Sequence, residues 1–213
     1  MKDLGKVWNR DPPTETQPLV LIVDDEAPMR AALRRLLFSA GLAVETFESG
    51  DALLAANPWQ RGACIVLDMK MPGMSGLDVQ RELNLRQVAL PVIFLTGAGD
   101  VPMAVAAMHA GAADFIEKPF DNVHLLDRIH QAIARGQQQR ERSEEQRETR
   151  RRLERLTPRE RQVLEQVLAG HTSKEIARIL GASHRTIDIH RAHLMEKMAA
   201  ETLADLIRLC LRG

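Results

Sequence analysis

Aromatic side chains are scarce in this chain of 213 residues: they make up 3% of it, and tyrosine is absent. A groove that stacks sugars or bases on several aromatic rings is therefore not expected. The only two cysteines, Cys64 and Cys210, lie far apart in the sequence. They give neither a disulfide framework nor the spacing of a metal site, so a reducing compartment such as the cytoplasm is expected.

Long apolar runs and an excess of one charge are missing as well. The longest apolar stretches, such as Pro18–Val23 and Val92–Leu95, are too short to span a bilayer, and the first six residues lack the apolar core of a secretory signal. We therefore expect a cytoplasmic protein without membrane contact. Basic and acidic side chains number 29 each. This balance argues against a uniformly basic nucleic-acid binder but does not tell where the charges lie.

Residues 17–135 alternate between strand and helix patterns. The expected strands are Pro18–Val23, Leu42–Phe47, Ala63–Leu67, Pro91–Leu95 and Ala112–Ile116. The expected helices are Pro28–Ala40, Asp51–Ala56, Gly76–Leu85, Val101–Ala110 and one that starts near Asp121. Strands one, three and four are continuous apolar runs, which is typical of a parallel sheet covered on both faces. The pattern predicts a doubly wound α/β domain with a five-stranded parallel sheet of the flavodoxin-like type.

The remaining segments differ in character. Residues 136–155 are rich in Gln, Glu and Arg and nearly devoid of apolar side chains, so we expect a charged, solvated helical linker that extends the fifth helix. A short coiled coil is the alternative, but its seam would bury almost no Leu or Ile. Residues 1–16 are mostly polar and are expected to form a mobile N-terminal arm.

Residues 156–213 show helix starts and no strand pattern. Four residues can each cap a helix: Thr157, Thr172, Ser183 and Thr202. These four helix starts predict a second, small all-α domain of four short helices.

Acidic side chains follow two strands of the expected sheet. Asp24 and Asp25 come directly after the first strand, and Asp68 follows the third. If the strand order is 2-1-3-4-5, these carboxylates converge at the carboxyl edge, where open α/β sheets bind their ligands. Carboxylates this close repel one another unless a cation is bound or a proton is taken up. Mg2+, a hard ion that takes oxygen ligands, resolves the conflict.

A hydroxyl and an ammonium group belong to the same edge. Thr96 ends the fourth strand, and Lys118 follows the fifth. Together with the acids they form a set suited to phosphoryl transfer: a carboxylate attacks, and a metal ion and Lys118 neutralise the phosphoryl oxygens. Each residue alone is commonly a helix cap or a solvated side chain. Such residues at the ends of four different strands are harder to explain in that way.

These residues carry a resemblance to a known family. The segments Val23–Glu26, Asp68–Gly76, Thr96-Gly97 and Phe115–Phe120 resemble, in this order, the receiver domain of bacterial two-component response regulators over residues 17–135. The resemblance implies that Asp68 is the phosphoacceptor and that Thr96 and Lys118 hold the phosphoryl oxygens. It implies that Mg2+ is bound by Asp25, Asp68 and the backbone carbonyl of Lys70, with Asp24 completing the acidic pair.

Two positions modify what the resemblance implies. Phe115 takes the family's switch-aromatic position, where Tyr is frequent, so switching is expected to depend on packing alone. Lys70 places an extra cation beside the site, and we expect it to alter the lifetime of the acyl phosphate.

Ser173–Leu180, a turn at residues 181–183 and His184–Lys197 have the proportions of a helix-turn-helix. On the second helix a core face is formed by Ile187, Leu194, Met195 and Met198. The opposite face carries Arg185, Asp188, Ile189, Ala192, His193 and Glu196. Arginine can read guanine, aspartate can accept from cytosine, and Ile or Ala can touch a thymine methyl group. Lys174, Arg178 and Arg191 are better placed to contact phosphates.

Periodicity alone leaves a plain helical bundle and a DNA-binding domain equally open. The segments Leu156–Leu164, Lys174–Ala177 and Arg185–Arg191 resemble the LuxR-type helix-turn-helix over residues 156–213. Asp188 stands where many members carry Lys, and the turn before His184 is unusual, which leaves the target sequence open. Joined to the receiver, the chain is most similar to the FixJ-type subgroup. Of the three histidines of this helix, His184 and His193 are expected to point in different directions from His190, and no Cys supports them, so a metal site is not expected there.

The two resemblances imply a DNA-binding transcription regulator rather than an enzyme. A sensor histidine kinase would phosphorylate Asp68, homodimerisation through residues 100–117 would follow, and the dimer would bind double-stranded DNA, with RNA polymerase as a further partner. A haloacid-dehalogenase-type phosphatase requires a second acid where this chain has Lys70, and a dinucleotide enzyme requires a Gly-rich first turn. A third alternative is a regulator whose receiver no longer needs phosphate, but the complete set of acids, Thr96 and Lys118 argues against it.

The neutral total conceals an uneven distribution of charge. Residues 1–135 hold 13 basic and 17 acidic side chains, a net charge of −4, whereas residues 136–213 hold 16 and 12, a net charge of +4. Residues 156–213 alone hold 9 basic against 7 acidic side chains. So few possible phosphate contacts predict weak DNA binding by a monomer and make pairing the expected point of control.

Overall fold

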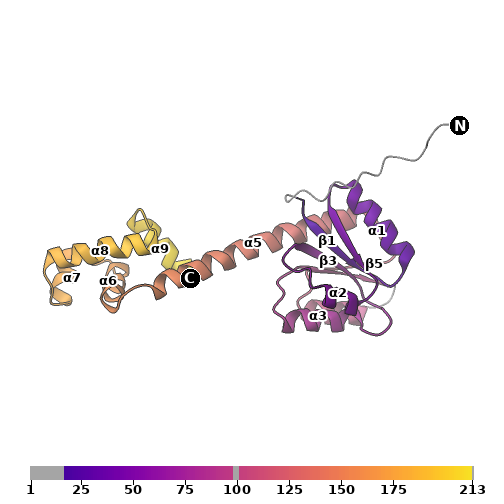
Figure 1. Ribbon diagram of the computed structural model, residues 1–213, viewed down its shortest axis with the longest axis horizontal. Coiled ribbons are helices and arrows are strands. Elements are labelled where there is room, and N and C mark those ends of the chain that lie inside the picture. Colours follow the sequence, from indigo (N-terminus) through magenta and orange to yellow (C-terminus); the bar gives the residue numbers. More distant parts are fainter. Residues whose placement is uncertain (1–16, 98–100, 213) are drawn as a thin grey trace. The chain divides into compact units, whose positions relative to one another are not determined.

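The computed structural model describes residues 17–97 and 101–212. The arm expected at residues 1–16 lies outside the described residues. The chain divides into two compact units between Gln139 and Arg140 (Figure 1). Within the described ranges, no helix is long and apolar enough to cross a membrane.

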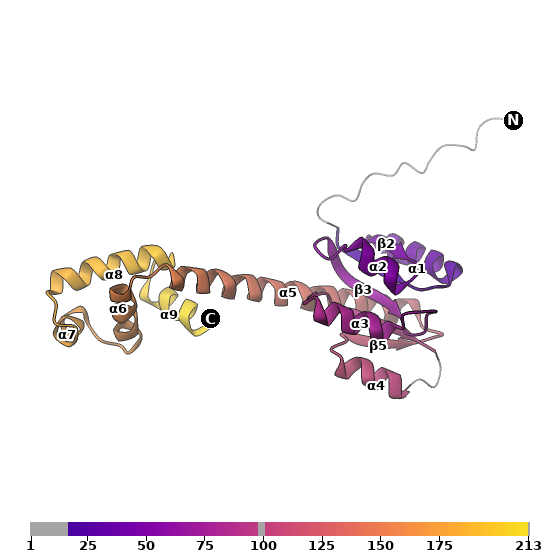
Figure 2. The same ribbon diagram turned by 60° about the horizontal axis from the view of Figure 1, so that its bottom comes forward.

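The N-terminal unit is a five-stranded parallel sheet with helices on both faces (Figure 2). Its strands are β1 (Leu19–Val23), β2 (Ala43–Phe47), β3 (Gly62–Asp68), β4 (Val92–Thr96) and β5 (Asp114–Glu117). Its helices are α1 (Ala27–Ser39), α2 (Gly50–Ala56), α3 (Gly76–Leu85), α4 (Val101–His109) and α5 (Asn122–Glu154), of which the last continues into the second unit. The strand order is β2-β1-β3-β4-β5, so the predicted doubly wound fold is confirmed.

Alternating side chains of the central strands supply two hydrophobic cores. Leu21 and Val23 of β1 pack on the side of α2 and α3, whereas Val20 and Ile22 pack on the side of α1 and α5. All four side chains are inaccessible to solvent. Burial on both faces is the reason why the central strands read as unbroken apolar runs. Only β5 starts two residues later than predicted, because the backbone N–H of Ala112 still bonds to α4 at Ala107.

The start of α3 is packed tightly against the end of β3. A Cβ atom added to Gly76 would lie 2.5 Å from the carbonyl oxygen of Asp68, so no larger residue fits without a shift. The N–H of Gly76 donates to the carbonyl oxygen of Met69, and Ser75 and Asp78 form a capping box around the first turn. The loop after Asp68 is therefore held at both of its ends.

The C-terminal unit contains α6 (Pro158–Leu168), α7 (Ser173–Ile179), α8 (His184–Met198) and α9 (Leu203–Arg212). Thr157 and Thr172 cap α6 and α7 through capping boxes, and Ser183 caps α8. Thr202 accepts a hydrogen bond from the N–H of Asp205 at the start of α9. The four predicted helix starts are thus confirmed.

The last turns of α5 pack on the C-terminal unit, although their sequence is polar. Thr149 is only 4% exposed, and Leu153 packs against the core of this unit. The guanidinium of Arg152 donates to the carbonyl oxygen of Met198 at 2.9 Å. The sequence of this segment predicts a solvated helix, but Thr149, Arg152 and Leu153 pack on or bond to the rest of the C-terminal unit.

A buried carboxylate connects α6 to α8. Glu160 accepts a hydrogen bond from the N–H of Thr157 at 2.8 Å, and the Nζ atom of Lys197 lies 2.7 Å from its Oε2 atom. Burial by itself would raise the pKa of Glu160, but the hydrogen bonds from Lys197 and Thr157 outweigh it and lower this pKa to about 2. The side chain thus remains charged inside the unit at any physiological pH.

We expect Glu160→Gln to lower the free energy of unfolding of the C-terminal unit by about 1–3 kcal/mol, because Lys197 loses its partner. The folded-state pKa lies below the unfolded value of 4.5, so the stabilisation is present above pH 4.5 and is lost as the pH falls towards 2. Calorimetric unfolding of the full chain at several pH values measures both effects. Glu165→Gln, an exposed change on the same helix, is the control, and an equal pH dependence in both variants would contradict the assignment.

Candidate functional site

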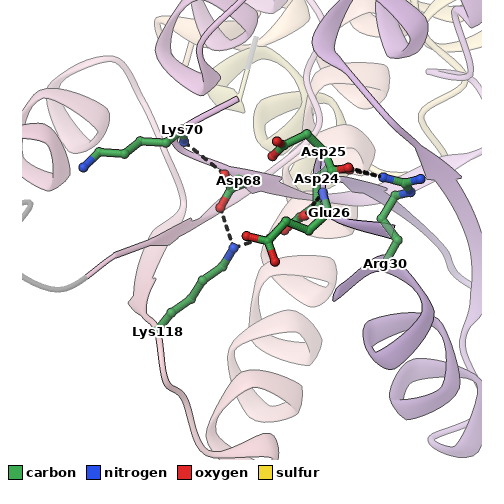
Figure 3. A network of polar contacts seen from close by, with 7 residues as sticks. All are labelled: Asp24, Asp25, Glu26, Arg30, Asp68, Lys70 and Lys118. Atoms are coloured by element: carbon green, nitrogen blue, oxygen red, sulfur yellow. Dashed lines mark hydrogen bonds and ion pairs between the residues drawn. The ribbon is translucent and has the colours of Figure 1, made fainter. Parts of the chain in front are cut away.

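The ammonium group of Lys118 lies between two carboxylates at the carboxyl edge of the sheet (Figure 3). Its Nζ atom is 2.6 Å from Oδ1 of Asp68 and 3.1 Å from Oδ2 of Asp24. Asp68 is 7% exposed and Asp24 is 1% exposed. Side chains from the ends of β1, β3 and β5 therefore meet, because neighbouring parallel strands end at the same edge.

Burial and charge act against each other in this cluster. Burial raises the pKa of Asp68 above its usual value and the nearby Asp24 adds to this effect, while the hydrogen bond from Lys118 opposes it. Burial also disfavours the ammonium form of Lys118, but its bonds to Asp68 and Asp24 outweigh this and raise its pKa. Lys118 is therefore held firmly in its charged form.

Backbone N–H groups hold the other oxygens of the two buried carboxylates. The N–H of Lys70 donates to Oδ2 of Asp68 at 3.1 Å, and the N–H of Glu26 donates to Oδ1 of Asp24 at 2.8 Å. Figure 3 shows the side chain of Lys70 extending away from Asp68, so this residue contacts the carboxylate through its main chain. Each buried carboxylate is fixed on two sides, which presets its orientation.

Arg30 belongs to this network, although it was not among the predicted site residues. One of its guanidinium nitrogens donates to the carbonyl oxygens of Asp24 at 2.7 Å and of Asp25 at 2.9 Å (Figure 3). Side chains of a helix lean towards its N-terminus, so an Arg in the first turns of α1 reaches the loop before it. That spacing is the sequence signal that points to Arg30. Its contact fixes the backbone on which both acids are carried.

The other predicted residues lie along the same edge. Asp25 is exposed on the loop after β1. Thr96 is 3% exposed, and its hydroxyl donates to the carbonyl oxygen of Gly97 at 3.3 Å. The N–H of Lys118 donates to the carbonyl oxygen of Thr96 at 2.7 Å, and the peptide bond to Pro119 is cis. Phe115 lies on β5 and is 43% exposed.

The donor set at this edge consists of oxygen atoms. Asp24 and Asp68 share the ammonium group of Lys118, and Asp25 lies exposed on the loop that Arg30 contacts. These three carboxylates against two cationic side chains leave an excess of one negative charge. In the part of the chain that the structure describes, no three acid, His or Cys side chains form a ready-made metal cluster. The chemistry of these donors nevertheless fits a hard divalent cation and not an ion that prefers sulfur or imidazole.

The candidate DNA-binding residues lie on the surface of α7 and α8. Exposed side chains are those of Lys174, Arg178, Arg185, Asp188, Ile189, Ala192 and His193, and Arg191 is half-buried. The predicted core face of α8 is confirmed, since Ile187, Leu194 and Met198 are buried and Met195 packs against them. Nδ1 of His193 is 4.0 Å from Oε1 of Glu160, so this side chain lies next to α6.

Comparisons with known proteins agree with this division of the chain. Residues 20–130 match the model of the response regulator receiver domain, and residues 154–210 match that of the bacterial regulatory proteins of the luxR family. The transcriptional regulatory protein FixJ of Azorhizobium caulinodans is 45% identical over 193 residues, which cover 90% of this chain and 91% of that protein. The response regulator protein TodT of Pseudomonas putida is 42% identical, with 89% and 84% covered.

Solved structures show the same similarity. A low-resolution structure of the response regulator StyR superimposes with a TM-score of 0.84 at 40% identity and covers 93% of this chain and 100% of that one. Full-length FixJ from B. japonicum gives a TM-score of 0.60 at 40% identity, with 92% and 97% covered. Receiver and LuxR-type domains together imply a sensor kinase and DNA as partners. The chain therefore belongs to the two-component response regulators that join a receiver to a LuxR-type DNA-binding domain, and it is a regulator of transcription like FixJ and TodT.

Proposed function

We propose that Asp68 is the residue that accepts the phosphoryl group from the sensor kinase. The observation that carries this proposal is the Lys118 ammonium group 2.6 Å from Oδ1 of Asp68. An oxygen of Asp68 attacks the phosphorus atom, the bond from phosphorus to the kinase histidine breaks, and an acyl phosphate forms. Lys118 then exchanges a carboxylate contact for a phosphoryl oxygen, and the hydroxyl of Thr96 donates to another.

The second cation of the site is proposed to be Mg2+. Asp24, Asp25, Asp68 and the backbone carbonyl of Lys70 would hold it, and its charge would neutralise the oxygens of the transferred group. Support comes from the oxygen-only donor set and from the negative charge that remains after Lys118 and Arg30 are counted. Arg30 fixes the loop that carries two of these acids, so it acts as a positioning residue.

Phosphorylation is proposed to promote homodimerisation through the face of α4 and β5. Among the described residues of the predicted 100–117 surface, Val105, Met108 and Phe115 are 51%, 45% and 43% exposed. Exposed apolar side chains in one region favour association with a second copy. Asp100, at the start of that surface, lies outside the described residues. The added charge of about −1.5 to −2 would draw Thr96 towards the phosphate and allow Phe115 to repack.

The dimer is proposed to bind double-stranded DNA with α8 in the major groove. Arg185, Asp188, Ile189, Ala192 and His193 would face the bases, and Lys174, Arg178 and Arg191 the phosphates. Their position on the surface of α7 and α8 supports this assignment. RNA polymerase is proposed as the partner that reads the bound dimer, and the cytoplasm as the compartment in which DNA and polymerase are found.

Asp68→Asn should abolish formation of an acyl phosphate, because an amide cannot act as the attacking carboxylate. The full chain is incubated with Mg2+ and a small acyl-phosphate donor, and intact-protein mass spectrometry counts the phosphoryl groups gained. Asp51→Asn, an exposed change on α2, is the control and should be phosphorylated like the wild type. Undiminished incorporation in Asp68→Asn would assign the phosphoacceptor elsewhere.

Arg30→Ala should weaken Mg2+ binding and slow phosphorylation several-fold, because two backbone carbonyls lose their shared donor. Titration calorimetry with Mg2+ alone measures the affinity independently of phosphorylation. Arg34→Ala removes the same charge one turn further along α1, where the side chain is exposed. If the guanidinium acted only through its positive charge, its removal would strengthen cation binding, which is the opposite result.

Phosphorylated wild-type protein should occupy specific DNA sites that Asp68→Asn occupies weakly, since pairing doubles the number of phosphate and base contacts. Genome-wide DNA pull-down from the host with both proteins measures the occupancy. Equal occupancy would exclude phosphorylation control. A lack of specific occupancy by either protein would exclude the proposed DNA contacts.

A further inference from the structure

The N-terminal end of α8 carries a histidine and an aspartate that contact each other. His184 is the first residue of this helix, and its Nδ1 atom lies 3.0 Å from Oδ2 of Asp188, one turn later. The two side chains are 61% and 51% exposed, and neither belongs to the buried core of the C-terminal unit. The pair is therefore on the outer surface of the helix, where packing does not require it.

The helix end that carries this pair is well ordered by its own hydrogen bonds. The hydroxyl of Ser183 accepts from the N–H of Thr186 at 3.1 Å, and the two hydroxyl groups lie 2.8 Å apart. Such a cap fixes the direction in which the first turn presents its side chains. His184 thus approaches Asp188 from a fixed backbone position.

An aspartate is an unusual side chain to present to DNA. Duplex DNA carries a negative charge about every 1.7 Å along its axis, so a lone carboxylate is repelled. The imidazole of His184 reduces that repulsion, because it donates from Nδ1 as the cation or as the neutral tautomer with its proton on that atom. The contact uses Oδ2, so Oδ1 of Asp188 is left to accept a hydrogen bond from a ligand.

A carboxylate discriminates strongly among the base edges of the major groove. Guanine presents two acceptors there and thymine an acceptor and a methyl group, which a carboxylate does not match. Adenine presents a donor beside an acceptor, whereas cytosine presents the N4 amino donor alone. A fixed carboxylate therefore favours cytosine over the other three bases.

We propose that His184 is a positioning residue that holds the carboxylate of Asp188 to accept from N4 of cytosine, so that the pair specifies one C·G base pair in each half-site. The inference rests on the proposed placement of α8 in the major groove. Arg185 and Ile189, exposed on the same face, contact neighbouring positions. The unusual residues at 184 and 188 thus act together as one element of specificity.

Selection from a random library of duplex DNA tests the proposal with the full chain, with and without phosphodonor. The wild type should select a motif with cytosine at one position of each half-site. Asp188→Asn should change this preference from cytosine to adenine, because an amide pairs with both N6 and N7. Asp188→Ala should reduce the preference for cytosine about tenfold, and other positions should be retained.

A positioning role of His184 differs from a merely structural one in which base preference its variants change. His184→Ala should weaken the same cytosine preference about three- to tenfold, with little further loss when combined with Asp188→Ala. His184→Gln, which keeps an N–H donor, should restore part of it. Glu196→Gln, further along the outer face of α8, is the control and should leave this position unchanged.

Two results would overturn the inference, and they are distinguishable. If His184→Ala lowers the affinity for all sequences equally, or leaves the cytosine preference intact, the histidine does not position Asp188. If the wild type selects no motif under either condition, the placement of α8 in the major groove fails, and the pair fails with it. Thermal unfolding of each variant shows whether the C-terminal unit remains folded.

Discussion

One ammonium group shared by two buried carboxylates is the interaction on which the N-terminal unit depends. Lys118 comes from the end of β5, whereas Asp68 and Asp24 come from the ends of β3 and β1. The strand order β2-β1-β3-β4-β5 places the ends of β1, β3 and β5 close enough for these three side chains to meet. Charges that are removed from water cost several kcal/mol each unless they are paired. The fold therefore neutralises the cluster only in part, and the remaining negative charge is what supports the proposal of a metal ion and a phosphoryl group at this edge.

The features of this arrangement that could be predicted are those that depend on residue type. Apolar runs gave the strands, and acids at their ends gave the edge, because parallel strands place their carboxyl ends together. Arg30 acts on backbone carbonyls and Lys70 through its own N–H, so residue type alone reveals neither contact, and only the position of Arg30 in the first turns of α1 points to it. The contact of Glu160 with Thr157 is local and follows from the predicted helix start at Thr157, but Lys197 lies 37 positions away and joins Glu160 only in the folded unit. Long-range polar contacts thus could not be predicted, even in the C-terminal unit, where the four helix starts were predicted correctly.

The composition of the linker also failed to predict its contacts. Residues 136–155 contain too few apolar side chains to predict burial, and a solvated helix is the natural interpretation. In the structure, Arg152 reaches a backbone carbonyl and Thr149 is covered. Amphipathic side chains bury their stems while their polar groups find partners, so burial does not require a hydrophobic residue. The end of α5 is consequently part of the C-terminal unit as well as a connection to it.

Several basic side chains of residues 156–213 have partners within the C-terminal unit. Lys197 is used by Glu160 and Arg208 by Asp205, while Arg159 and Arg161 donate to backbone carbonyls within the unit. The basic side chains assigned to phosphates or bases are then Lys174, Arg178, Arg185 and Arg191. The three of these assigned to phosphates, Lys174, Arg178 and Arg191, give a slope of roughly −3 for log affinity against log salt, and a pair of units roughly −5. The step from one to two units therefore changes affinity more than any single base contact does. The balance of charge in the sequence and the ion pairs of the structure therefore support the same proposal, which is that this protein acts on DNA in pairs.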